Sequence, residues 1–257
     1  MISAPSALER EHGQRREAVV QSVLREVFSG QLRAGQHLVT RALAERFGVS
    51  HTPVREALVA LAGLGIVDLL PNRGAVVRQV TARDVREVCQ VRRALECEAV
   101  RLACGRIESG KLEALRLCLL ELGAVPAEGA AAFIVRAREL DSRLHDLVAW
   151  ASGNAFLAAE LGRLKIVFRA FRDVSWEHQD ARNDYRRLEE ETGEHLAIIE
   201  ALMAADRRRA VWAMARHIMA GGRYWSQVAS EPARQLLTSK STARASPARS
   251  HPGEEAS

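Results

Sequence analysis

Hydrophobic positions in the first 80 residues follow a helical period and then change to short continuous runs. This pattern predicts three helices and two strands, over residues 15–28, 41–47, 51–62, 66–70 and 75–80. The two apolar runs flank Pro71-Asn72-Arg73-Gly74, a turn signal, and therefore predict a β-hairpin. Two short helices joined by a tight turn and followed by a hairpin are typical of a winged helix-turn-helix.

The residues between the two short helices are those that a tight turn requires. Thr40 is the expected N-cap of the helix over 41–47, and Gly48 is placed to end that helix in a left-handed conformation. Ser50 is the expected N-cap of the next helix, and Pro53 lies in its first turn, where the missing N–H costs little. The local sequence thus agrees with the hydrophobic pattern.

From residue 81 onward the pattern is helical, and we find no strand signal. Thr81 is an N-cap with Asp84 three residues later, which is a capping-box-like start. Breaks at glycine, proline and polar residues divide this half into helices over 82–106, 109–123, 129–151, 154–174, 182–204 and 207–228. The predicted fold is therefore mostly α, with a winged helix-turn-helix (three helices plus a β-hairpin wing) before an all-α antiparallel bundle of about six helices.

The chain of 257 residues is long enough for two hydrophobic cores. We expect a flexible N-terminus over 1–14, a winged helix-turn-helix domain over 15–80, an all-helical domain over 81–229, and a disordered tail over 230–257. The predicted tail is rich in Ser, Pro, Ala and Arg, a composition that cannot build a core.

Composition and charge narrow the class of protein further. Hydrophobic residues make up 47% of the chain and charged residues 27%, as in globular proteins. We find neither an apolar run of about 18 residues nor a signal peptide, so we expect a cytoplasmic, nucleoid-associated protein without membrane contact. The net charge of +5 permits nucleic acid as a partner. The cysteines form no Cys-x-x-Cys pair and are expected as reduced core residues.

The second helix of a helix-turn-helix contacts base edges with its N-terminal turn. Here that turn and its surroundings supply hydroxyl, imidazole and guanidinium groups, which suit phosphate and base contacts. The predicted DNA-binding residues are Arg41, Ser50, His51, Thr52, Arg55, Arg73 and Gly74. Arg73 at the wing tip, followed by the permissive Gly74, suits the minor groove or a phosphate. The alternatives are that Ser50 only caps its helix and that the charged residues are solvated surface.

This stretch resembles the DNA-binding domain of the GntR family of bacterial transcription regulators. The resemblance rests on a Gly-x-Leu-x-x-Gly lead-in, a Leu-Ala pair, a Val-Ser-x-Thr-Pro-Val-Arg-Glu-Ala-Leu run and an Arg-Gly wing, at 30–35, 43–44, 49–58 and 73–74. It implies a double-stranded DNA operator as partner. One position departs from the family pattern: the residue after Ser50 is commonly Arg in the family and is His51 here, which leaves one DNA contact open.

Polar residues interrupt the inward stripes of three predicted helices in the second half. Asp141 and His145 lie four apart and share one helix face, while His195 and His217 lie on the inward stripes of two later helices. A carboxylate and three imidazoles that converge in a bundle core suit a divalent metal ion. The alternative is that each is a core histidine with an ordinary hydrogen-bond partner.

The order Asp-x-x-x-His, then Glu-His, then Arg-His resembles the FadR C-terminal (FCD) effector domain of GntR regulators. The resemblance implies that the four residues Asp141, His145, His195 and His217 bind a divalent metal ion. Zn²⁺ is our first expectation, with Ni²⁺, Mn²⁺ or Fe²⁺ as alternatives. The resemblance also implies a small carboxylate effector bound in this domain.

Two further residues are predicted to bind the effector. Arg92, which interrupts the apolar face of its helix together with Glu96, offers a bidentate grip for a carboxylate. The alternative for Arg92 is an internal ion pair with Glu96. Asn154 follows a Ser-Gly break and is either a helix cap or a residue of the effector pocket.

The sequence therefore favours a ligand-responsive regulator, not an enzyme. We expect a homodimeric repressor that binds a palindromic operator and whose DNA affinity the effector changes. A metal-dependent hydrolase or lyase that uses the Asp/His cluster is one alternative, but it leaves the first 80 residues unexplained and lacks a separate nucleophile or base. An architectural DNA binder with a structural metal is the other alternative.

Overall fold

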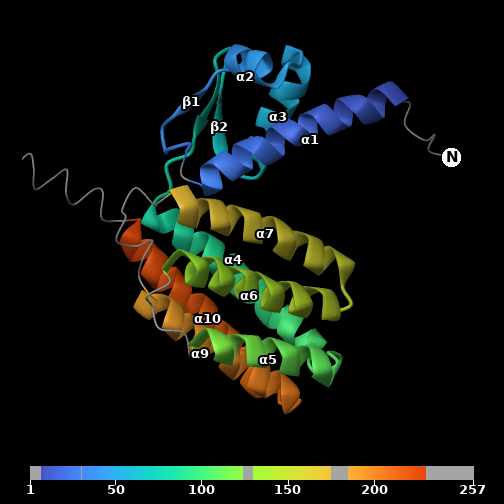
Figure 1. Ribbon diagram of the computed structural model, residues 1–257, viewed down its shortest axis with the longest axis vertical. Helices are drawn as coiled ribbons and strands as arrows, with labels where there is room; N and C mark the ends of the chain where they lie inside the picture. The colour runs from blue at the N-terminus through green and yellow to red at the C-terminus, as the bar shows by residue number, and fades with distance from the viewer. Residues whose placement is uncertain (1–6, 30, 124–129, 175–184, 230–257) are drawn as a thin grey trace, which may run out of the picture.

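The computed structural model describes residues 7–29, 31–123, 130–174 and 185–229 and confirms the predicted fold class (Figure 1). The winged-helix half consists of α1 (Ala7–Phe28), β1 (His37–Leu38), α2 (Thr40–Phe47), α3 (His51–Gly63), β2 (Val67–Leu70) and β3 (Gly74–Val77). The bundle consists of α4 (Ala82–Ala103), α5 (Ser109–Gly123), α6 (Ala130–Ala151), α7 (Ala155–Val174), α9 (Tyr185–Met203) and α10 (Arg207–Val228). The predicted tail over 230–257 lies outside the described residues.

The core of the winged-helix half forms where α1 packs on α3. Its innermost side chains include Val19, Val23, Val27, Leu58 and Leu61, each at most 1% exposed. α1 begins at Ala7 instead of the predicted residue 15. The first turns of α1 carry exposed pairs such as Glu11–Arg15, so no hydrophobic period marks them in the sequence.

The wing is a three-stranded antiparallel sheet in the order β1-β3-β2. The predicted hairpin is formed by β2 and β3, whereas β1 is not among the predicted elements, because a strand of two residues carries no period. Gly74 has φ 91°, and an added Cβ there would lie 2.1 Å from the carbonyl oxygen of Leu38. The pairing of β3 with β1 therefore requires a glycine at this position.

The helix-turn-helix differs from the sequence prediction in how its helices begin. The prediction of Thr40 as an N-cap is wrong, because α2 starts at Thr40 itself and Val39 takes the cap position without a side-chain hydrogen bond. β1 ends next to Val39 and holds it in an extended conformation. Ser50 does take the cap position of α3, but its hydroxyl makes no capping hydrogen bond. Gly48 follows α2 in the predicted left-handed conformation, with φ 62°.

The bundle helices match their predicted ranges closely. At the start of α4 the predicted capping box is present, because the Thr81 side chain accepts from the Asp84 amide and the Asp84 carboxylate accepts from the Thr81 amide. The largest fully buried side chains of the bundle are Leu112, Leu119, Leu140, Leu144, Ile198, Ile199 and Met214. None of the helices in the described ranges has the length and apolar character needed to cross a bilayer.

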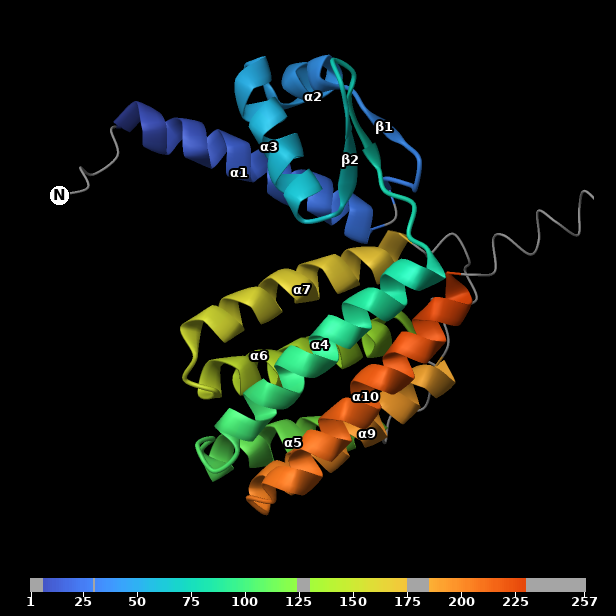
Figure 2. The ribbon, with the colours of Figure 1, turned by 180° about the vertical axis from the view of Figure 1, so that it is seen from behind.

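α7 connects the two halves of the molecule. It lies between α1 and the other bundle helices in both ribbon views (Figures 1 and 2). Ala170 belongs to the hydrophobic core of the winged-helix half, and Ile166 packs against that core. Leu161 instead belongs to the core of the bundle. Arg163 also donates to the carbonyl oxygen of Gly63 at the end of α3, at 3.5 Å.

Candidate metal centre and DNA-reading helix

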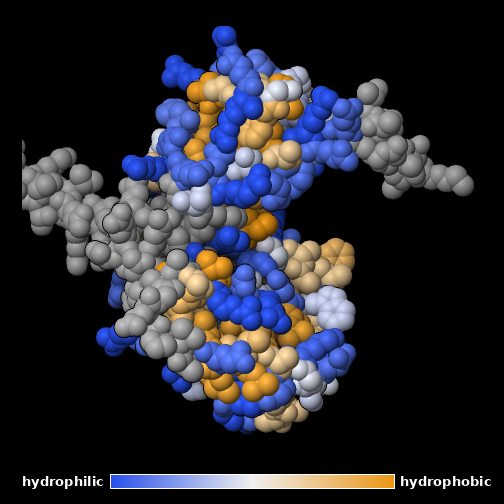
Figure 3. Space-filling model, viewed as in Figure 1, coloured by the Kyte–Doolittle hydropathy of each residue, from blue (hydrophilic) through white to orange (hydrophobic). Residues whose placement is uncertain are grey.

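α3 has one buried face and one exposed face. Its buried residues are Pro53, Val54, Ala57, Leu58 and Leu61. The predicted DNA contacts Ser50, His51, Thr52 and Arg55 are all exposed at its N-terminal end. Hydrophilic side chains also project from the outer edge of this half, away from the bundle (Figure 3). The α3 N-terminal turn therefore presents donors and acceptors that a duplex can reach.

The other predicted DNA contacts lie on α2 and in the wing. Arg41 is 80% exposed, and its Nε donates to Glu45 at 2.8 Å. Arg73 is exposed in the turn between β2 and β3. The structure explains Gly74 by its close approach to β1, so its need for glycine is steric whatever else the wing contacts.

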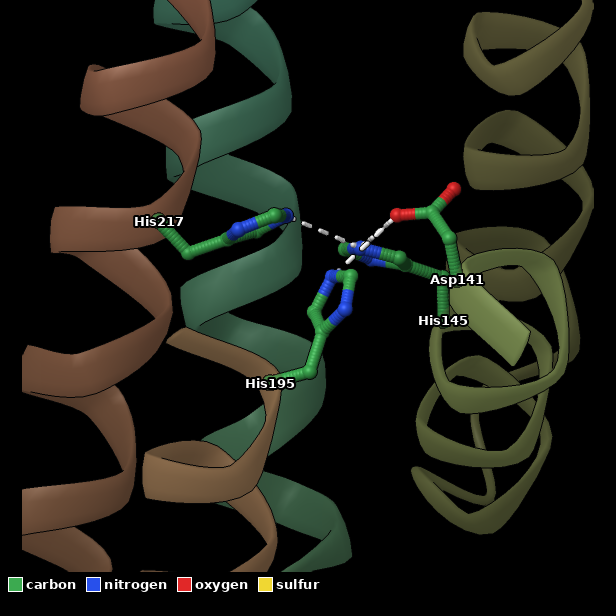
Figure 4. A group of neighbouring side chains, drawn as sticks. All are labelled: Asp141, His145, His195 and His217. Atoms are coloured by element: carbon green, nitrogen blue, oxygen red, sulfur yellow. Dashed lines mark hydrogen bonds and ion pairs between the residues drawn. The ribbon is translucent and has the colours of Figure 1, made fainter. Parts of the chain in front are cut away.

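Four polar side chains converge in the bundle, from three helices (Figure 4). Asp141 and His145 come from α6, His195 from α9 and His217 from α10, and one potential ligand atom of each lies within 4.8 Å of the others. The His145 Nε2 atom lies 3.4 Å from Asp141 Oδ1 and 3.3 Å from His217 Nε2. The structure thus brings together all four residues predicted to bind a metal.

Carboxylates hold the outer nitrogens of two of these imidazole rings. His145 Nδ1 donates to Glu96, and His217 Nδ1 donates to Glu194 at 2.9 Å. An ionised carboxylate can only accept a hydrogen bond, so each Nδ1 carries the proton. The Nε2 atoms of both rings face the centre of the cluster.

The charges around the cluster set its protonation. Burial by itself raises the pKa of Glu96, but Arg92 and His145 beside it lower that pKa to about 2. Burial by itself lowers the pKa of His145, but the carboxylates, Glu96 foremost, raise it to about 10. Burial and the neighbouring His195 lower the pKa of His217 to about 4. At neutral pH the metal-free centre thus combines ionised carboxylates with a neutral His217 and a protonated His145, and a cation bound there would displace the proton from His145 Nε2.

His195 shows whether the cluster suits a metal ion. Its buried Nε2 lies 3.2 Å from Asp141 Oδ1, but this nitrogen makes no hydrogen bond within the described part of the chain. A buried polar nitrogen without a partner is costly, and a cation at the centre would satisfy it. One oxygen and three nitrogen ligands fit Zn²⁺ and equally Ni²⁺, Mn²⁺ or Fe²⁺.

A cavity of about 660 Å³ adjoins the cluster, between α4, α6, α7, α9 and α10. Its lining includes Arg92, Glu96, Asp141, His145, Arg187 and His217. Several of the potential metal ligands therefore form part of the wall of a space that is large enough for a small molecule.

The two predicted effector-binding residues differ in position. Arg92 lines the cavity, and its guanidinium donates to Glu96 at 2.8 Å and stacks on Phe168, 4.3 Å from the ring centroid. The internal ion pair with Glu96, which is the alternative interpretation for Arg92, is therefore present in the cavity wall. Asn154 is exposed and is not among the residues that line the cavity. Its Oδ1 caps α7 by accepting from the Leu157 amide at 3.1 Å. For Asn154, only the cap interpretation has structural support.

Sequence reasoning gave no separate role to Glu194 and did not consider Arg187. Glu194 enters the sequence argument only as part of the Glu-His motif. Arg187 is buried and pairs with Glu194 at 3.0 Å. Their spacing of seven residues places them on one face of α9 and is the signal that would have linked them.

Comparisons with known proteins match the two halves of the chain to two family models. Residues 15–77 match the gntR family of bacterial regulatory proteins, and residues 87–220 match the FCD domain. The chain is 28% identical over 185 residues to the HTH-type transcriptional repressor RspR of Escherichia coli. The aligned region covers 72% of this chain and 77% of that protein. It is 29% identical over 209 residues to a probable D-xylose utilization operon transcriptional repressor of Paenarthrobacter nicotinovorans, covering 77% and 83%.

A solved structure, E. coli McbR/YncC, shares the fold with a TM-score of 0.66 and 22% identity, over 83% of this chain and 97% of that one. The matched families and the named relatives are transcriptional regulators, not enzymes.

Proposed function

We propose that this chain, which belongs to the gntR family of bacterial regulatory proteins and carries an FCD domain, is a repressor controlled by a small carboxylate bound beside a divalent metal. The observation that carries the proposal is the convergence of Asp141, His145, His195 and His217 beside a cavity, whose wall includes Asp141, His145 and His217. These four residues would hold the metal, and a bound metal supplies positive charge that attracts a carboxylate.

Arg92 supports an acid as the effector. It lies in the same cavity wall as the cluster, its side chain is only 11% exposed, and Phe168 fixes the plane of its guanidinium. A guanidinium held in place binds a carboxylate with little loss of side-chain freedom. A small acid in this cavity would therefore meet the part of the Arg92 guanidinium that Glu96 leaves open, together with the positive charge of the metal.

α7 provides a physical route from the cavity to the DNA-reading half. Phe168 lines the cavity and contacts Arg92, while Ala170, two residues later, lies in the core of the winged-helix half. Because α1 packs on α7, any shift of α7 caused by a bound acid would also displace α1. A ligand that favours one position of α7 would change DNA affinity by its differential affinity for the two positions.

The proposed repressor binds its palindromic operator as a homodimer, with one helix-turn-helix from each copy of the chain. Two helix-turn-helix units on a palindromic operator read half-sites about 34 Å apart, one turn of the duplex. α4 and α10 pack against each other (Figure 2), and their exposed apolar side chains include Val91, Trp212 and Met219, which are 49%, 58% and 45% exposed. A homodimer formed through these two helices would cover exposed apolar side chains.

Arg55→Ala tests the assignment of α3 as the reader. Removing an exposed guanidinium that contacts a base is expected to cost about 1–3 kcal/mol of specific binding, or about 5- to 150-fold in affinity. The measurement is fluorescence anisotropy with a duplex that the wild-type protein selects from a randomised pool.

The control for this variant is Arg86→Ala, which removes the same charge from an exposed position on α4. It is expected to bind the selected duplex as the wild-type protein does, apart from the general effect of net charge. If both variants bind equally well, α3 does not read DNA through Arg55. If no duplex is enriched from the pool, the repressor proposal itself fails.

A further inference from the structure

Two of the clustered histidines share a pattern of contacts that the third does not show. His145 Nδ1 donates a hydrogen bond to the carboxylate of Glu96 on α4, and His217 Nδ1 donates one to the carboxylate of Glu194 on α9. In each case the histidine lies on one helix and its glutamate on a neighbouring one. The hydrogen bond therefore fixes both the proton and the orientation of the ring, so that Nε2 faces the centre.

Each of these glutamates is held by a buried arginine on its own helix. Arg92 donates through Nε to Glu96 at 2.8 Å, four residues away. Arg187 donates through Nη1 and Nη2 to Glu194, at 3.1 Å and 3.0 Å, seven residues away. The arginine side chains are 11% and 7% exposed, so these charge-assisted bonds are shielded from water.

We propose that Glu96 and Glu194 are positioning residues of the metal centre, each fixed by an arginine, and that they set its metal affinity by orienting His145 and His217. The proposal rests on the proposed function, since it needs the cluster to bind a metal. We call each chain of hydrogen bonds from arginine through glutamate to histidine a relay: one is Arg92–Glu96–His145 and the other is Arg187–Glu194–His217. The glutamate loses its freedom to rotate because the arginine also donates to its carboxylate, on Oε1 of Glu96 and on both oxygens of Glu194, and the imidazole is thus oriented before any metal binds.

α9 contains a matched control for this proposal. Glu191 and Glu194 are both 21% exposed, and both pair with Arg187, Glu191 through Nε at 3.2 Å. Only Glu194 also reaches a potential metal ligand, His217. Replacing either glutamate by glutamine removes one negative charge beside Arg187, but only Glu194→Gln alters the relay.

The experiment is a titration of the full-length, metal-stripped protein with Co²⁺, followed by the visible absorption of the bound ion. Glu194→Gln is expected to weaken Co²⁺ binding by about 10- to 100-fold and to change the shape of the absorption band. Glu191→Gln is expected to leave both unchanged. Thermal unfolding of the metal-stripped variants shows whether each is folded before the titration.

The outcomes separate this proposal from the function on which it rests. If the wild-type protein binds Co²⁺ and Glu194→Gln binds it equally tightly, or if both variants lose affinity equally, the positioning role is wrong while the metal centre stands. If the wild-type protein binds no Co²⁺, the metal centre and its positioning residues both fail. Should Glu194→Gln not fold, Glu96→Gln tests the other relay, with the same expected loss and the same contrary result.

Discussion

His195→Ala is expected to remove the stabilisation that Zn²⁺ would give to the wild-type protein through the proposed metal centre. Within the described part of the chain, the buried Nε2 of His195 makes no hydrogen bond and its close polar contact is with Asp141 Oδ1 at 3.2 Å, so the metal-free variant loses packing and this one contact. A metal that binds only the folded state adds about 2.7 kcal/mol to the free energy of unfolding when its free concentration is 100 times Kd. With one of four ligands removed, we expect this gain to fall to near zero.

Urea unfolding with Zn²⁺ and with chelator measures the gain directly. His37→Ala is the control, because His37 is an exposed histidine of β1, outside the cluster. It should keep the full response to Zn²⁺. A His195→Ala protein that Zn²⁺ stabilises as much as the wild type would show that the ion binds elsewhere.

Gly74→Ala is expected to disrupt the wing and, with it, DNA binding. The backbone strain of a side chain at φ 91° costs about 1–3 kcal/mol. In addition, the new Cβ would overlap the carbonyl oxygen of Leu38, which is 2.1 Å away. The pairing of β1 with β3 should then open and shift the wing tip, where Arg73 lies. The free energy of unfolding and the affinity for the selected duplex should both fall.

Gly63→Ala is the matched control for this substitution. Gly63 is the last residue of α3, and an added Cβ there would meet nothing within 4 Å. Its expected effect is neutral or a gain of about 0.4–1 kcal/mol. If Gly74→Ala unfolds at the wild-type urea concentration and binds DNA normally, the wing does not depend on this close approach.

Much of the fold could be predicted from the sequence because its signals are local. The bundle helices show a hydrophobic period, and Thr81 with Asp84 forms the capping box that their spacing indicates. The four clustered polar residues could also be identified from the sequence, since each interrupts an inward stripe and Asp141 lies one turn before His145. What the sequence could not supply was their distances, which depend on how α6, α9 and α10 pack.

The features that the sequence missed depend on tertiary contacts. In the sequence, Arg187 looks like an ordinary surface charge. Its role follows from the packing of α9 against α10, which brings its partner Glu194 to His217. β1 exists only because β3 lies beside it. Thr40 has the right chemistry for an N-cap, but the strand that ends at Leu38 determines where α2 begins.

The central claim is that metal and acid in the bundle control the winged-helix half. Its most direct test is the affinity of the wild-type protein for its selected duplex, measured with Zn²⁺ or with EDTA across small acids from acetate to citrate and gluconate. We expect at least one acid to change the affinity of the Zn²⁺-loaded protein by about 5- to 150-fold, and the change to vanish with EDTA. Equal affinities with Zn²⁺ and with EDTA, in every acid, would contradict the account.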